Sequence, residues 1–215
     1  PQGGEMEDTN YLTKTWQAFV QQIIHNASQG YYFYNYYELA ENRRKSLLKI
    51  DRTIIDRFDT SKSKDRRYHH KKAGKANYKF LRYELQFIIM KSVGEETCSD
   101  TAFKDIRKDP LTLRIGPVLE LKLHKKADKG VTVCLSKDCY RNIKYELLEM
   151  LEHRQKDRVI DRFNLLNNIP AYAGIIEHKR QILKELLRAA KKHQVTFKRK
   201  KFKLITKLKK VKVFE

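Results

Sequence analysis

Two short runs of alternating residues place the strongest constraint on the fold. Residues 119–124 (LELKLH) and 131–135 (VTVCL) each alternate apolar with mostly polar side chains. Because successive side chains of a strand point to opposite faces, each run presents one apolar face. The intervening segment 125–130 is polar or small and ends in a glycine. This pattern predicts a β-hairpin near residues 118–135.

Helical spacing of apolar residues appears in other parts of the chain. Apolar side chains recur three and four positions apart, which forms a single stripe on a helix. The pattern predicts helices around residues 16–24, 50–58, 159–166 and 175–190. Ser136 is a suitable N-cap for a further helix that reaches about Glu152, since its hydroxyl can accept a hydrogen bond from the first turn.

The remaining regular segments favour strands. Six of the seven residues at 31–37 are aromatic, and alternation over 81–89 is typical of a half-buried strand. Helices and strands therefore mix along the chain. The sequence predicts an α+β fold in which several helices pack on a small, mostly antiparallel sheet. We expect a flexible leader at 1–10, a single α+β domain at 11–194 and a basic C-terminal extension at 195–215.

A large excess of positive charge bounds the choice of partners. The 215 residues include 47 Lys and Arg against 26 Asp and Glu, which gives a formal net charge of +21. Such self-repulsion favours a polyanionic partner. We expect a non-catalytic protein that binds RNA or DNA, as a component of a ribonucleoprotein or of a mobile-element nucleoprotein assembly with other proteins. No apolar stretch approaches the ~20 residues that span a bilayer, so no membrane partner is expected.

The segment 62–82 is the most informative basic region. It contains nine Lys and Arg and a single acid, Asp65. Its cations can neutralise phosphates and its tyrosines can stack on bases. The alternative interpretation is an ordinary exposed basic loop. The residues expected to contact nucleic acid are Arg66, Arg67, Tyr68, His70, Lys71, Lys72, Lys75 and Tyr78.

Two further regions are candidates for the same interface. From Lys191 onward there are eleven Lys and Arg and one acid, interleaved with apolar residues that a wholly disordered tail would rarely carry. Near the tyrosine run at 31–37, cations could support a base-stacking platform, although alternate rings of a strand should enter a core. The candidate residues near the tyrosine run are Arg43 and Arg44. Those in the C-terminal segment are Lys198, Arg199, Lys200, Lys201 and Lys203.

One catalytic arrangement is an alternative function. Asp109, Glu120 and Lys122 resemble, in residue type and rough spacing, the core of PD-(D/E)xK nucleases. That resemblance implies two carboxylates that hold Mg²⁺ and a lysine that positions water. Here the order is Asp-Pro, not Pro-Asp, and the match covers about fourteen residues. An E-x-K pattern on a polar strand is also common by chance in so charged a chain.

Other chemistries are less well supported. The adjacent His69 and His70 would point apart in a strand, which disfavours a nicking site built on a histidine pair. The chain shows no zinc-ligand spacing or glycine-rich phosphate loop. We therefore expect no metal or other cofactor except Mg²⁺ under the nuclease alternative. An odd number of cysteines, at positions 98, 134 and 139, fits a reducing cytoplasm better than a secreted disulfide framework.

Overall fold

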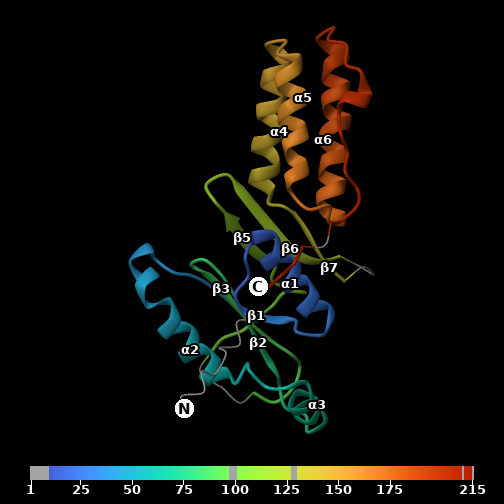
Figure 1. Cartoon of the computed structure of the whole chain (residues 1–215). Coiled ribbons are helices and arrows are strands. Elements are labelled where there is room, and N and C mark those ends of the chain that lie inside the picture. The colour runs from blue at the N-terminus through green and yellow to red at the C-terminus, as the bar shows by residue number, and fades with distance from the viewer. Residues whose placement is uncertain (1–9, 97–100, 127–129, 210, 215) are drawn as a thin grey trace. The chain divides into compact units, whose positions relative to one another are not determined.

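The computed structural model describes residues 10–96, 101–126, 130–209 and 211–214 (Figure 1). Their contacts form two compact units, one containing residues up to Pro110 together with those from Val211, and the other containing Leu111–Lys210. The α+β class with antiparallel sheets is confirmed. The single domain over 11–194 stays a prediction, and the predicted leader lies almost wholly outside the described residues. None of the described helices is long and apolar enough to cross a membrane.

The first unit contains a four-stranded antiparallel sheet with strand order β2-β3-β1-β4. The predicted strand in the aromatic run is confirmed as β1, and the predicted helices at 16–24 and 50–58 are confirmed as α1 and α2. The elements are α1 (Trp16–Ser28), β1 (Phe33–Glu38), the 3-10 helix η1 (Glu41–Ser46), α2 (Leu47–Phe58), α3 (Lys64–Lys72), β2 (Tyr78–Tyr83), β3 (Gln86–Lys91) and β4 (Lys104–Asp105).

The prediction of one strand over 81–89 is wrong, because the chain reverses in the middle of it. Strands β2 and β3 form a hairpin in which Tyr83 pairs with Gln86. Glu84, in the turn, has a φ of +48°, a left-handed conformation that usually attracts glycine or asparagine. The sequence carries neither residue here, so the alternation of apolar and polar residues continues through the turn and gives no sign of it.

A buried ion pair links the sheet to α2. The Arg82 Nε on β2 donates a hydrogen bond to an Asp51 carboxylate oxygen on α2 at 2.9 Å, and the Arg82 Nη2 lies 2.9 Å from the same oxygen as an ion pair. Arg82 is 6 % exposed and Asp51 is 1 % exposed. Beside this pair, the aromatic side chains of Phe58, Phe80 and Phe87 form the apolar cluster between α2 and the sheet. The orientation of α2 is thus set by charge as well as by apolar packing.

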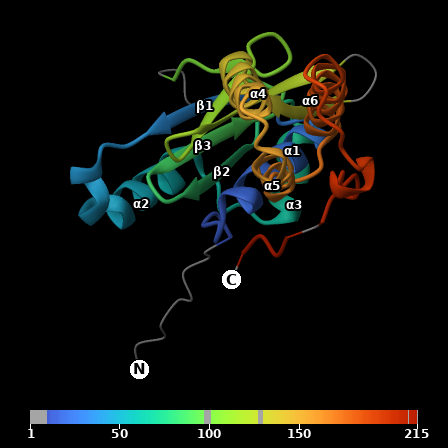
Figure 2. The same ribbon diagram turned by 90° about the horizontal axis from the view of Figure 1, so that it is seen from above.

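The second unit contains the predicted hairpin, which is confirmed as β6 and β7, with β5 on the other side of β6. Ser136 caps α4 as expected, because its hydroxyl accepts from the Cys139 N–H at 3.2 Å. Helices α4, α5 and α6 run side by side (Figures 1 and 2). The elements are β5 (Leu111–Ile115), β6 (Leu119–Lys126), β7 (Gly130–Leu135), α4 (Lys137–Glu152), α5 (Lys156–Leu165), η2 (Leu166–Asn168), α6 (Ala173–Lys192) and η3 (Arg199–Lys201).

The basic C-terminal segment packs on α5 over part of its length. Phe202 is 6 % exposed and meets Phe163 edge to face, with ring centroids 5.3 Å apart. Asn164 donates to the Lys201 carbonyl at 3.1 Å and accepts from the Lys203 N–H at 2.8 Å. The apolar residues interleaved with its lysines thus include an anchor in the core of the second unit.

Loss of the Arg82 side chain should strongly destabilise the first unit. Arg82→Met leaves Asp51 buried without its cation, and breaking a buried pair in this way costs about 3–5 kcal/mol. We expect the double variant Asp51→Leu/Arg82→Met to recover much of that loss, because no unpaired charge remains. Urea unfolding followed by fluorescence of Trp16, the single tryptophan of the sequence, measures both. Equal loss in the two variants would contradict this account.

Stability of the second unit should rise with pH above about 8. Lys179 on α6 is 2 % exposed and donates to the Ile169 carbonyl at 3.3 Å. Burial lowers its pKa to about 8, whereas the unfolded chain holds this proton until about 10.5. Between those values the unfolded state binds more protons, so unfolding becomes harder by up to about 1.4 kcal/mol per pH unit. Denaturation of wild type and Lys179→Met at pH 7.5, 8.5 and 9.5 should show this slope in wild type only.

Candidate nucleic-acid interface

Helix α3 is unusual because none of its residues is buried. The sequence-based alternative of a basic loop is wrong for residues 64–72, which are helical. The helix begins at Lys64 after its N-cap Ser63, whose hydroxyl accepts from the Arg66 N–H at 3.3 Å, and it ends before Gly74, which has a φ of +72°. It is attached to its surroundings by polar contacts. Arg67 donates to the Lys62 carbonyl, and Asn77 donates to the Arg67 carbonyl at 2.9 Å.

One face of α3 lines a hollow of about 360 Å³, which we call the tyrosine groove. Its helical residues are Lys64, Arg67, Tyr68 and Lys71, at the spacing i, i+3, i+4 and i+7 that shares one face. The other lining residues come from the segment between α1 and β1, from the residue just before β2 and from the two residues that follow β3. These non-helical lining residues include Tyr31 and Asn77.

The tyrosine groove combines three kinds of chemistry. Lys64, Arg67 and Lys71 supply positive charge, and Tyr68 is 63 % exposed. Burial raises the pKa of Tyr31, so this hydroxyl stays neutral at physiological pH. Asn77 is 3 % exposed, and its Oδ1 has no hydrogen-bond partner among the described residues. Cations, an open ring and a buried acceptor are therefore gathered in one place.

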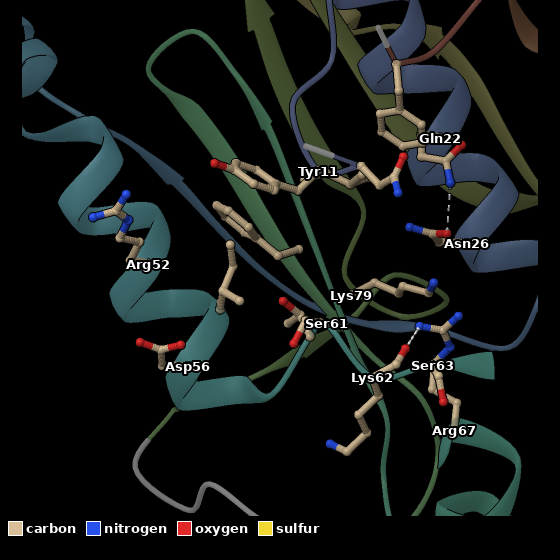
Figure 3. A pocket seen from close by; sticks show the side chains of 16 residues that line it. Tyr11, Gln22, Asn26, Arg52, Asp56, Ser61, Lys62, Ser63, Arg67 and Lys79 are labelled. Atoms are coloured by element: carbon tan, nitrogen blue, oxygen red, sulfur yellow. Dashed lines mark hydrogen bonds between the residues drawn. The ribbon is translucent and has the colours of Figure 1, made fainter. Parts of the chain in front are cut away.

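A second and larger hollow, of about 610 Å³, is here called the Asn26 pocket (Figure 3). Arg67 lines it as well as the tyrosine groove, so the two hollows share this residue. Asn26 and Gln22 contribute from α1 and Lys79 from β2, while the segment 60–63 leads into α3. Tyr11 and Phe214, which are far apart in the sequence, also line the pocket.

The structure separates the predicted residues of the basic segment. Arg67, Tyr68 and Lys71 share the tyrosine groove. The remaining residues predicted on α3 and just after it, Arg66, His70, Lys72 and Lys75, do not line it. Arg66 instead reaches Asp59, with an N–O distance of 3.7 Å.

Tyr78 belongs to the core of the first unit. It is 1 % exposed and packs between Phe58 and Phe103, with ring centroids 5.3 and 6.0 Å away. No face of its ring is open to a base. The predicted stacking role of Tyr78 therefore does not fit its position, because β2 turns this side chain toward α2.

The candidate residues outside α3 lie on other elements. Arg43 and Arg44 are exposed on η1, where Arg44 pairs with Glu41 at 2.9 Å. The tail residues Lys198, Arg199, Lys200, Lys201 and Lys203 belong to the second unit, and Lys201 reaches Asp157 at 3.7 Å. Within β1, Tyr34 is buried, whereas Tyr37 is 42 % exposed and stacks on Phe87 at 5.0 Å.

The three residues of the nuclease alternative fall in different units. Asp109 is in the first, whereas Glu120 and Lys122 lie on β6 in the second. Glu120 pairs with Arg114 on β5 at 3.3 Å. In the described part of the chain, no three His, Cys, Asp or Glu residues are grouped so as to hold a metal. The nuclease alternative stays a prediction.

Lys64, Lys79 and Asn77 fall within the basic segment and Tyr31 within the tyrosine run, but sequence reasoning named none of them as a site residue, and it missed Asn26 altogether. A helical projection of residues 64–72 would have grouped Lys64 with Arg67, Tyr68 and Lys71. The sequence also pointed to Asn26, because this polar residue interrupts the apolar side of α1 beside the buried Ile23 and Ala27. The others come together only through the tertiary structure.

Because α3 buries no side chain, its N-cap should matter more than usual. Ser63→Ala removes an acceptor worth ~1 kcal/mol to the helix. We expect the α3 amides to exchange hydrogen about fivefold faster, with little change in the amides of α1 or the sheet. Hydrogen–deuterium exchange resolved by mass spectrometry measures this. Unchanged exchange in α3 would show that its tertiary contacts alone hold the helix.

Comparisons of this chain with protein-family models, with curated proteins and with solved structures found no match. The tyrosine groove and the Asn26 pocket are therefore the basis on which a function is inferred.

Proposed function

We propose that this protein is a non-catalytic nucleic-acid-binding protein that holds a single strand in the tyrosine groove. The observation that carries the proposal is the shared face of Lys64, Arg67, Tyr68 and Lys71, which places three cations beside an exposed ring. Basic residues that served only to keep the protein in solution would not need to line a hollow together. The net charge of +21 supports a polyanionic partner.

Each side of the tyrosine groove suits a different part of a nucleotide. Lysine and arginine contact phosphates and position the strand without reading its sequence. Tyr68 can stack on any base, at ~1–3 kcal/mol per stacked base. Asn77 lines the groove, and its unpartnered Oδ1 is an acceptor that would pair with an amino or imino group of a base if a bound strand exposed it. Stacking and edge contacts require an unpaired base, which favours single strands over a duplex.

Binding should depend on salt in a way that identifies the face of α3. We expect log K to fall with log salt, by about 0.7 per phosphate contacted on a single strand. Lys64→Gln/Lys71→Gln removes two contacts and should flatten the slope by about 1.4. Fluorescence anisotropy with labelled single-stranded RNA and DNA, from 50 to 300 mM salt, measures this.

The matched control removes the same charge from other positions on the same helix. Arg66→Gln/Lys72→Gln also lowers the net charge by two, but neither residue lines the tyrosine groove. We expect it to change the slope much less. Equal slopes for the two double variants would mean that α3 acts through its overall charge, and a wild-type slope near zero would refute nucleic-acid binding.

A further inference from the structure

We propose that the Asn26 pocket binds the terminal phosphate of the strand held in the tyrosine groove. This inference rests on the proposed function and extends it, because it assigns the protein a preference for strand ends. The ligand chemistry is a phosphate monoester with up to two negative charges.

Asn26 provides the first observation. Its side chain is buried, with 1 % of the residue exposed, and its Oδ1 accepts from Gln22 Nε2 at 3.3 Å. That bond leaves the Asn26 Nδ2 on the other side, where it has no hydrogen-bond partner among the described residues. Figure 3 shows this nitrogen pointing into the pocket. A buried amide donor without an acceptor is costly, so a ligand that accepts its hydrogen bond gains that free energy.

Positively charged residues line the same pocket as this donor. In Figure 3 the ammonium group of Lys79 lies between the Asn26 amide and the guanidinium of Arg67. The described lining residues include a single acid, Asp56, which Figure 3 places on α2, away from this cluster. Two cations and a neutral donor suit a dianionic phosphate better than a carboxylate with one charge.

The start of α3 adds to the same wall. Ser63 lines the pocket and is the N-cap of this nine-residue helix. The positive end of a helix dipole favours an anion nearby. Thr60 and Ser61 contribute hydroxyl groups to the lining, and these can donate to phosphate oxygens.

The position of Arg67 connects the pocket to the tyrosine groove. Because this residue lines both hollows, a phosphate on one side of it can belong to the same nucleotide chain as a base on the other. An internal phosphodiester carries a single charge and needs room for chain on both sides. A terminal phosphate is joined to the nucleotide chain on one side only, and its two negative charges match the two cations, Arg67 and Lys79.

The test compares oligonucleotides of one sequence that differ at their ends. We expect a strand with a 5′ or a 3′ phosphate to bind wild type about tenfold more tightly than the same strand with hydroxyl ends, since charged hydrogen bonds are gained. A nucleoside monophosphate should compete only weakly if the phosphate that the pocket binds belongs to the end of a strand. Equal affinity for phosphorylated and unphosphorylated strands would overturn the inference, and so would a monophosphate that competes as well as the strand.

Two variants separate this inference from the proposed function. Asn26→Asp places a carboxylate at the donor, and Lys79→Gln removes a cation without adding a buried charge. Each should abolish the preference for a phosphorylated end, and the second guards against misfolding of the first. Lys64→Gln/Lys71→Gln should weaken both strands alike and keep the preference. If no strand binds wild type at all, the proposed function fails, whereas binding without an end preference removes only the terminal-phosphate site.

Discussion

The buried pair of Arg82 and Asp51 determines how the first unit is assembled. The Arg82 side chain holds α2, while its backbone N–H donates to the Tyr11 carbonyl at 2.8 Å and its carbonyl accepts from the Thr13 N–H at 2.9 Å. One residue thus joins an edge strand, a helix and the segment before α1. Burial raises the pKa of Asp51, and Arg82 opposes that shift, so the carboxylate depends on its partner to stay charged. Because Tyr11, α2 and β2 all contribute to the Asn26 pocket, this pair also positions its walls.

Helix α3 stands in contrast to that buried assembly. Most helices are fixed by an apolar stripe, but α3 presents its cations to solvent and is attached by a cap and backbone contacts. Arg67 has two roles there. It ties the helix to the preceding loop through Lys62, and it lines both hollows. A helix attached in this way can adjust to a ligand at little cost in buried surface.

The regular elements were largely predictable because their patterns are local. The hairpin of β6 and β7, the Ser136 cap and helices α1 and α2 all follow from spacing within a few residues. The turn at Glu84 was missed because its left-handed residue is neither glycine nor asparagine.

The candidate site was predicted only in part. Sequence reasoning found Arg67, Tyr68 and Lys71 by their charge and aromatic character, but Asn26 and Lys79 join them through contacts between distant segments. Tyr78 was misjudged because a basic neighbourhood does not show which way a strand side chain points.

The route of the chain also affects the order in which these parts can be completed during synthesis. Residues 211–214 belong to the first unit, where the Val211 N–H and carbonyl bond the Gln21 side chain at 3.2 and 3.4 Å and Phe214 lines the Asn26 pocket. The second unit is thus inserted within the first. A ribosome makes all of residues 111–210 before it reaches Val211, so the lining of the Asn26 pocket is completed only after the whole insertion has been translated.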